Sequence, residues 1–383
     1  MNREETFIYH LQKKVTKNFG KKINTATDCE NLSICIQTIT NKNISSQTLR
    51  RFYGLIPSSS KISHFTLDVL SIYCGFTDWD QFLKTFQQDE LESFFGNSEH
   101  SGENYWSKSS ELCKKLITSP ELLLTTHQKL MGYPMARKFF LEHHPMRDLL
   151  GTVYSQYFLS YLKYNTNEEA KIFAYGFLFI SAFLTQNEEL MSLFYLKLEN
   201  TKLSDEVFVI PAGLKFGIML LYADYTKNEN LFNKTFLQMK KARKKYILAS
   251  EKSVCSFEYS VLELLIFTDR KKEILFLMEN NTKQINSDNQ YVPFERKQTH
   301  DEVWKILCAY AYQKLQDKEK TDVILKNVNL DKLGIGWKKY YSILYYFTKI
   351  NHENTSNPSD FETLNNLISL THFSYFQNQM SKI

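Results

Sequence analysis

The sequence contains few of the residues that make tight turns, with 12 glycines and 7 prolines among 383 residues. A β-sandwich or β-barrel needs many such turns, and glycine and proline are the residues that most often build them. Aromatic residues are frequent instead, with 29 Phe and 23 Tyr, so large flat side chains must fill much of the core. We expect an all-α protein whose helices are joined by short polar loops.

Long apolar runs are also absent. The most apolar segment covers residues 172–184 and still contains tyrosine and serine, whereas a membrane-spanning helix needs about 18 or more apolar residues. Residues 1–5 lack the apolar centre of a signal peptide. These absences predict a cytoplasmic protein that does not enter a membrane. The six cysteines form no CxxC pair and are expected to be reduced and mostly buried.

Motifs that would indicate an enzyme, a cofactor or a metal are missing as well. The sequence has no GxxxxGK[ST] phosphate-binding loop and no GxGxxG nucleotide-binding turn. Its cysteines have neither metal-ligand spacing nor the local signature of a catalytic nucleophile. We therefore expect no catalytic residues, no cofactor and no metal ligands.

The length of the chain predicts more than one domain, because 383 residues exceed what a single core usually accommodates. Residues 1–88 contain short helical segments separated by turn signals. Residues 89–110 are polar, include two glycines and lack sustained periodicity, and we interpret them as a linker. Residues 111–383 form a succession of amphipathic helical segments.

The third region contains similar polar tetrads between aromatic-rich helical segments. The tetrads begin at positions 185, 226, 268 and 316, and so lie 41, 42 and 48 residues apart. One predicted helix precedes each tetrad and another follows it. Repeats of this length with two helices each are typical of stacked helical hairpins, which bury their apolar faces against one another. The tetrads are Thr185–Glu188, Thr226–Glu229, Thr268–Lys271 and Gln316–Glu319.

This region resembles a tetratricopeptide array, a stack of helical hairpins. The spacing is longer than the usual period of about 34 residues, and the Trp/Gly/Tyr consensus of that repeat is missing. The region is therefore described as tetratricopeptide-like. An irregular helical domain is the alternative.

The most informative segment begins at Asp28, which can cap a helix over residues 29–39. The turn that follows contains Asn41, and asparagine tolerates the left-handed conformation. Ser45 can cap a second helix, and Gly54 can end it. The residues predicted to point inward are Leu32, Cys35, Ile36 and Ile39 in the first helix, with Ile44, Leu49 and Phe52 in and before the second.

The segment follows roughly the recognition-helix pattern Val-Ser-x-x-Thr-Ile-x-x-x-x-x-Gly of the Cro-repressor/Xre family. The corresponding residues are Ile44, Ser45, Thr48, Leu49 and Gly54, the last lying one position earlier than the glycine of the pattern. The segment thus resembles the helix-turn-helix of that family, although its turn is longer and lacks the usual Ala and Gly. The resemblance covers about 60 residues. It implies a further helix, matched by residues 65–76, and a small core that Trp79 and Phe82 close.

Charge around this segment is mostly positive. Residues 13–61 contain nine lysines and arginines against Asp28 and Glu30, a local charge of +7, whereas the whole chain has a formal net charge of +5. Basic side chains neutralise phosphates and release counterions, which gives nucleic-acid affinity its dependence on salt. A solvated basic face on a protein-interaction domain is the alternative.

The resemblance implies a DNA-binding site on the second helix, whose N-terminal end would enter the major groove. Gln47 suits adenine and Arg50 suits guanine, and Ser46 can reach a base edge or a phosphate. The site further includes Arg51 on the outward face and, for backbone phosphates, Lys42, Asn43, Ser59 and Lys61 in the flanking loops.

Two functions follow as hypotheses. The first is a transcriptional regulator that binds double-stranded DNA as a homodimer and whose helical repeats sense a peptide, a small ligand or a protein. Its domain order resembles that of regulators which join a Cro-like head to tetratricopeptide repeats, an analogy at the level of fold. The second is a non-enzymatic adaptor with no DNA role, for example in a stress or phage-defence assembly. The surface around residues 46–51 discriminates between them.

Overall fold

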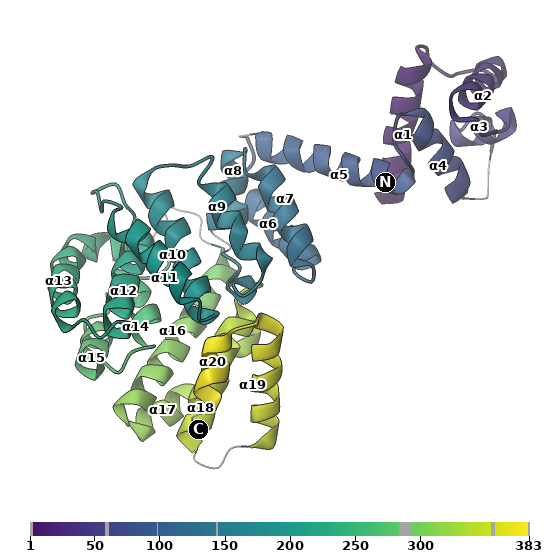
Figure 1. The fold of residues 1–383 in the computed structure, drawn as a ribbon. Helices are drawn as coiled ribbons and strands as arrows, with labels where there is room; N and C mark the ends of the chain where they lie inside the picture. The colour runs from purple at the N-terminus through teal and green to yellow at the C-terminus, as the bar shows by residue number, and fades with distance from the viewer. Residues whose placement is uncertain are drawn as a thin grey trace. The chain divides into compact units, whose positions relative to one another are not determined.

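The computed structural model describes residues 3–57, 61–97, 99–142, 145–282, 293–353 and 357–381. Throughout these ranges the chain forms helices and turns and no strand, which confirms the all-α expectation (Figure 1). The chain divides into two compact units, Met1–Asn97 and Ser98–Ile383. Each unit is described by itself.

The first unit is built from five helices around one small core. They are α1 (Arg3–Phe19), α2 (Ala26–Thr40), α3 (Ser46–Phe52), α4 (His64–Tyr73) and α5 (Trp79–Gly96). The core contains Leu32, Ile36, Ile44, Leu49, Phe52, Trp79 and Phe82, as the sequence predicted, together with Leu11, Val15, Cys29, Leu67, Val69 and Leu70.

Two details of α2 differ from the prediction. The N-cap is Thr25, not Asp28, and Asp28 closes a capping box from the third helical position. From this position in the first turn, the Asp28 carboxylate accepts a hydrogen bond from the Thr25 amide at 3.0 Å. Ile39 does not join the buried face but is 63% exposed. Cys29 lies on the buried face in place of Ile39, since positions 29, 32 and 36 follow the helical period.

The predicted linker is mostly helical. Residues 89–96 belong to α5, and residues 102–110 belong to α6 (Gly102–Leu116). Ser101 caps α6 by accepting a hydrogen bond from the amide of Asn104 at 3.2 Å. The two helices therefore cover most of the predicted linker, because a polar stretch with a good N-cap can still form a helix.

The second unit begins with short helical segments. These are α6, α7 (Pro120–Leu130), α8 (Pro134–Ala136), the π-helical η1 (Arg137–Glu142), the 3₁₀ segments η2 (Arg147–Leu149) and η3 (Val153–Gln156), and α9 (Tyr157–Tyr161).

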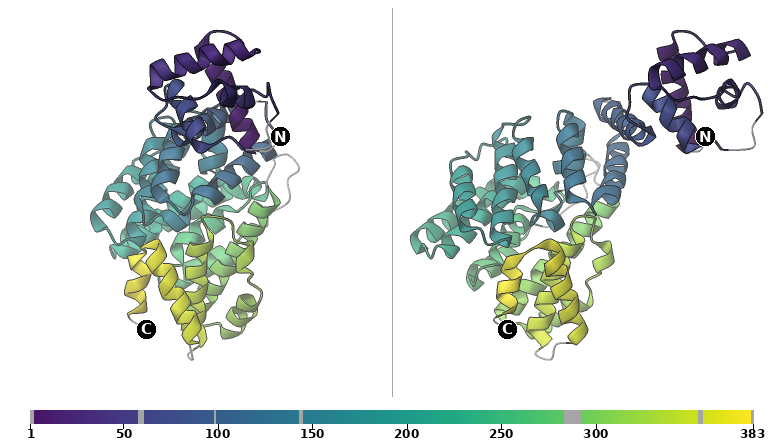
Figure 2. Two further views of the ribbon diagram at one scale, coloured as in Figure 1. Left: turned by 90° about the vertical axis from the view of Figure 1, so that its right-hand side faces the viewer. Right: turned by 45° about the vertical axis from the view of Figure 1, so that its right-hand side comes forward.

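Five pairs of helices follow, and the two members of each pair pack together (Figures 1 and 2). The first members also pack in a row, in chain order, and α20 (Ser374–Met380) returns to α10 at the end. Segment η2 contacts α18 and segment η3 contacts α10, so the row curves around the beginning of the unit. The pairs are α10 (Glu168–Leu184) with α11 (Glu188–Glu199), α12 (Val209–Tyr225) with α13 (Glu229–Glu251), α14 (Phe257–Leu265) with α15 (Lys271–Glu279), α16 (Phe294–Leu315) with α17 (Lys318–Lys326), and α18 (Lys338–Glu353) with α19 (Pro358–Thr371).

The polar tetrads are the turns within the pairs. In the first, Thr185 ends α10, Gln186 adopts φ +58° and Asn187 caps α11. The Asn187 amide donates to the carbonyl of Ala182 at 2.8 Å, the long-range bond of a Schellman motif. The tetrad at 226 repeats this arrangement with Lys227 at φ +54° and Asn228 as cap, and the tetrad at 316 places Gln316 at φ +64°. The residue types at the helix ends therefore allowed the positions of these turns to be predicted from the sequence.

Glycines inside the helices allow the first members of the pairs to approach closely. A Cβ atom on Gly213 of α12 would lie 2.7 Å from the Phe257 carbonyl oxygen and 2.6 Å from Ser260 Cβ, both of α14. Gly176 of α10 is similarly close to Leu214. Side chains at these positions would force the helices apart.

No helix in the described ranges has the length and apolarity needed to cross a lipid bilayer. All six cysteines lie within those ranges and are free thiols, and four of them are buried.

Candidate nucleic-acid interface and candidate ligand cavity

Helices α2 and α3 and the turn between them present the surface predicted to bind DNA. Asn41 adopts φ +54° at the end of α2. Ser45 caps α3, accepting from the Thr48 amide at 3.1 Å. Gly54, at φ +71°, follows the last turn of α3. The local sequence thus fixes both ends of this short helix.

The predicted contact residues divide between the turn and two lines along α3. Lys42 and Asn43 are exposed in the turn. Gln47 and Arg51, four residues apart, are both exposed, so one outer line of the helix offers an amide and a guanidinium. The other predicted residues are Ser46 and Arg50, both half-buried, Lys61, exposed before α4, and Ser59, which lies outside the described residues.

Arg50 has an acidic partner that the sequence analysis did not assign. Its Nη2 atom donates to Glu30 Oε1 on α2 at 3.3 Å, and the two side chains are 31% and 55% exposed. Exposed pairs of this kind contribute little stability, about 0–1 kcal/mol. Arg50 is consequently held against α2 by a weak contact.

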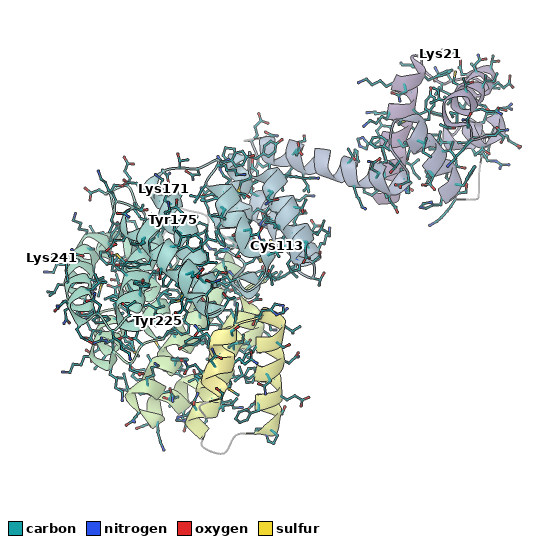
Figure 3. All side chains as sticks on the ribbon, viewed as in Figure 1. Lys21, Cys113, Lys171, Tyr175, Tyr225 and Lys241 are labelled. Atoms are coloured by element: carbon teal, nitrogen blue, oxygen red, sulfur yellow. The ribbon has the colours of Figure 1, made fainter. Side chains whose placement is uncertain are left out.

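The two acidic residues of the basic stretch are both paired with basic residues. Asp28 binds Lys21 at 2.7 Å (Lys21 is labelled in Figure 3). That hydrogen bond, with those from Thr25 and Asn24, holds the pKa of the Asp28 carboxyl well below its usual range. With Asp28 and Glu30 thus engaged, the outward charge of this surface comes from lysines and arginines such as Lys42 and Arg51.

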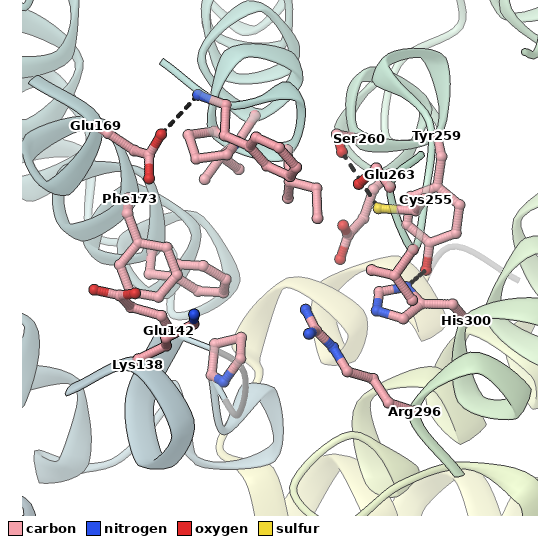
Figure 4. A pocket seen from close by; sticks show the side chains of 18 of the residues that line it. Lys138, Glu142, Glu169, Phe173, Cys255, Tyr259, Ser260, Glu263, Arg296 and His300 are labelled. Carbon is pink, nitrogen blue, oxygen red and sulfur yellow. Dashed lines mark hydrogen bonds between the residues drawn. The ribbon is translucent and has the colours of Figure 1, made fainter. Parts of the chain in front are cut away.

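The second unit contains a cavity of about 430 Å³, surrounded by η1, η2 and the first members of four helix pairs (Figure 4). Such a volume is within the range of sites for small organic ligands. Its wall is partly aromatic and partly charged. The aromatic residues are Phe139, Tyr161, Phe173, Phe177, Phe208, Tyr259 and Trp337.

An arginine–glutamate pair forms part of the cavity wall. Arg147 of η2 donates from Nε to Glu263 Oε1 at 2.8 Å and from Nη2 to Oε2 at 3.2 Å. The Tyr341 hydroxyl donates to the same carboxylate at 2.5 Å. The guanidinium also lies over the Trp337 ring, 4.2 Å from its centroid. The charge of Glu263 is therefore matched by Arg147, and both side chains are nearly inaccessible to solvent.

Three nitrogens on this side of the cavity have no hydrogen-bond partner among the described residues. Arg147 Nη1 and Arg296 Nε are donors, and His300 Nε2 is a donor or an acceptor according to the tautomer of the ring. His300 Nδ1 is engaged with the Tyr259 hydroxyl at 3.2 Å. Burial, with the positive charges of Arg296 and Arg147, holds the pKa of His300 well below its usual value, so its imidazole is neutral at pH 7.

Arg296 is in an unfavourable electrostatic environment. Burial and the charge of Arg147 lower its pKa to about 10, although the nearby Cys255 acts in the opposite direction. No ion pair joins Arg296 to a carboxylate in the described ranges, whereas Arg147 has Glu263. Arginine still remains protonated at neutral pH. The cavity therefore contains a cation without a matching anion.

Carboxylates line another part of the wall. Figure 4 shows Glu142 and Glu169 across the cavity from Arg296 and His300. Glu142 accepts from the Tyr161 hydroxyl at 2.6 Å, and Glu169 accepts from the Phe208 amide at 2.6 Å. Burial, and to a smaller extent the charge of Glu142, raises the pKa of Glu169. Lys138 also lines the cavity and lies beside Glu142 (Figure 4). The wall opposite Arg296 thus contains two carboxylates and one lysine.

The thiol in this wall is not an activated nucleophile. Burial raises the pKa of Cys255 to about 12, which leaves it protonated at neutral pH. Within the described ranges, no cluster of His, Cys, Asp and Glu has the composition of a metal site.

No local pattern in the sequence indicates this cavity, so it was not predicted. Arg147 and Glu263 are 116 positions apart and belong to different segments. Arg296 and His300 could have been noted as a basic pair on one helical face, but nothing nearby in the sequence indicates that this face is enclosed.

A basic run at 240–245 lies inside α13, which continues to Glu251. Arg243 binds Glu258 and donates to the Asn280 carbonyl at 2.6 Å. Lys245 reaches Asp205 at 3.4 Å, whereas Lys241 is exposed (Figure 3). Part of this run therefore joins α13 to neighbouring segments.

Comparisons of the chain with protein-family models, with curated proteins and with solved structures found no match.

Proposed function

We propose that this chain is a DNA-binding transcriptional regulator, in which α3 acts as the recognition helix of a Cro/Xre-like helix-turn-helix and the tetratricopeptide-like array senses a ligand. The observation that carries the proposal is the exposed line of Gln47 and Arg51 on a helix whose N-terminal turn is flanked by exposed Lys42 and Asn43. This arrangement offers one amide for a base edge and several donors for phosphates.

The Arg50–Glu30 pair is compatible with this role. An exposed pair contributes about 0–1 kcal/mol, whereas a bidentate contact between arginine and guanine is worth about 1–3 kcal/mol of discrimination. Arg50 can therefore leave Glu30 when a duplex is offered. A dimer would place two such helices on a two-fold site, and we include it in the proposal.

The proposal is tested with purified full-length protein and a pool of randomised duplexes, from which bound sequences are selected and their affinities measured at several salt concentrations. Arg50→Ala is expected to weaken binding to the selected sequence by about 1–3 kcal/mol and to relax the preference at one base pair. Glu30→Gln is the matched variant, because it frees Arg50 without removing it, and it should bind at least as tightly as the original protein.

Lys241→Gln serves as the control for a general loss of positive charge, since Lys241 is exposed in the other unit. The proposal fails if no duplex binds with a salt-dependent affinity, or if Arg50→Ala and Lys241→Gln have the same effect.

The adaptor hypothesis is favoured by a different observation. Ile34 and Ile39 of α2 are 64% and 63% exposed, and Phe65 at the start of α4 is also exposed. Large apolar side chains that remain exposed on a small unit are typical of protein-contact surfaces. An adaptor predicts that Ile34→Ser with Ile39→Ser abolishes co-purification of a partner, while Arg50→Ala and Gln47→Ala leave it unchanged.

A further inference from the structure

We propose that the cavity of the second unit binds a small organic anion with an aromatic or aliphatic body and its negative charge confined to one end. The anionic group would lie between Arg296, Arg147 and His300, and the body would lie along the aromatic wall. The inference names the ligand class for the sensing role proposed above and depends on that role only for its biological meaning.

The first support is the set of buried nitrogens that lack partners. Arg147 and His300 are 7% and 5% exposed, both line the cavity, and each has a nitrogen without a partner among the described residues. A buried polar group without a hydrogen bond costs about 1–3 kcal/mol. A carboxylate or phosphate has several acceptor positions, and could accept from Arg147 Nη1 and Arg296 Nε together.

The second support is charge. Glu263 is engaged by Arg147 and Tyr341, so it is not available to neutralise Arg296. Arg296 is half-buried, with its Nε atom shielded from solvent, and a charge in such a position without a partner is unfavourable. An anionic ligand would supply the missing partner for Arg296.

The opposite wall restricts the ligand further. Glu142 and Glu169 lie across the cavity from Arg296, and the pKa of Glu169 is already raised. A second negative group at the far end of a ligand would face these two carboxylates, with the single lysine Lys138 beside them, and would be repelled. The site therefore suits a ligand with one anionic end, and the other end is apolar or positively charged.

The apolar part of the wall favours an aromatic body. Phe173 and Phe177 of α10 lie in contact with each other, with ring centroids 5.0 Å apart, and Trp337 carries the Arg147 guanidinium on its face. Planar rings can pack against such surfaces with favourable offset or edge geometry.

The test uses three matched probes and isothermal titration calorimetry on the full chain at neutral pH, without DNA. The probes are naphthalene-2-carboxylate, its neutral amide, and naphthalene-2,6-dicarboxylate, which carries a negative charge at both ends. We expect the monoanion to bind about tenfold or more tightly than either of the others, the ratio that corresponds to one charged hydrogen bond. Equal affinity for acid and amide, or no measurable binding of the monoanion, would overturn the proposal.

Arg296→Gln separates a binding role from a structural one. Because the ligand-free protein holds an unmatched, half-buried charge at this position, Arg296→Gln should raise the temperature of thermal unfolding while weakening the binding of the monoanion about tenfold or more. A purely structural arginine would give the reverse, a lower unfolding temperature with unchanged affinity. Arg270→Gln, which removes a guanidinium paired with Asp224 and Glu229 away from the cavity, is the control and should leave the affinity unchanged. Since no DNA is present, failure here leaves the DNA-binding proposal intact, and loss of DNA binding leaves this result intact.

Discussion

Each of the two units contains an arginine–glutamate pair, and the two pairs differ in every respect that determines their energy. Arg50 and Glu30 touch through one bond of 3.3 Å and are 31% and 55% exposed. Arg147 and Glu263 share two bonds, accept a third partner in Tyr341, and are 9% and 7% exposed. The same two residue types thus form a loose surface contact in one unit and an enclosed network in the other.

This difference determines what each unit can offer to a binding partner. A surface arginine on a weak contact can be redirected to another anion at little cost, as the DNA-binding proposal requires. An enclosed arginine cannot be removed from its carboxylate without leaving a charge buried. In the second unit it is therefore Arg296, the arginine without a carboxylate, that remains available for a ligand.

The largest expected effect comes from breaking the enclosed pair. Arg147→Met leaves the Glu263 carboxylate buried without its partner and should lower the free energy of unfolding by about 3–5 kcal/mol. Arg50→Met, the matched change in the first unit, should cost no more than about 1 kcal/mol. Calorimetric unfolding of both variants measures the two effects, and similar losses would show that the pairs are not different in kind.

A smaller effect is expected from the glycines, which the two units also use differently. Gly213→Ala places a methyl group 2.7 Å from a carbonyl oxygen of the neighbouring helix and should destabilise the second unit by about 1–3 kcal/mol. Gly54 in the first unit has open space around it but a φ of +71°, so Gly54→Ala meets only backbone strain of about 1–2 kcal/mol.

Chemical denaturation of both glycine variants checks this prediction. Gly132→Ala is the control, because its added methyl group would come no closer than 3.9 Å to Tyr164. A tolerated Gly213→Ala would mean that α12 and α14 can separate without loss.

The smallest effect is expected from pH. The pKa of His300 is lowered in the folded chain, so the unfolded chain binds the extra proton more readily. Its contribution to stability is complete above the ordinary histidine pKa of about 6.5 and is lost as the pH falls below that value. His300→Gln should make the unfolding temperature less sensitive to pH between about 6.5 and 5 than in the original protein. Identical pH profiles would show that His300 does not carry this dependence.

Burial raises the pKa of Asp148 to about 6, and this shift changes stability with pH in the direction opposite to that of His300. A carboxyl with a raised folded pKa loses stability as the pH rises from about 4 to 6. The comparison with His300→Gln is therefore made at each pH, where the Asp148 contribution is common to both proteins.

Much of the local structure was predictable from residue types at helix ends. Asn187, Asn228 and Ser45 cap helices because their short side chains accept a hydrogen bond from a backbone amide. The sequence predicted the cap at Ser45 and placed the two asparagines in polar tetrads between helices. Ile39 was assigned wrongly, because helical period alone cannot tell which side of a helix another helix covers. The linker was predicted over too long a range for a related reason, since a polar helix with good caps looks like a loop in composition.

The sequence by itself determined the helical class of this protein, the turns at its polar tetrads and the two ends of α3, because these depend on interactions between residues a few positions apart. The tertiary structure alone decided which charges are enclosed. Arg147, Glu263, Arg296 and His300 meet only because the row of first helices curves around η2, and a buried charge depends on surroundings that come from distant parts of the chain.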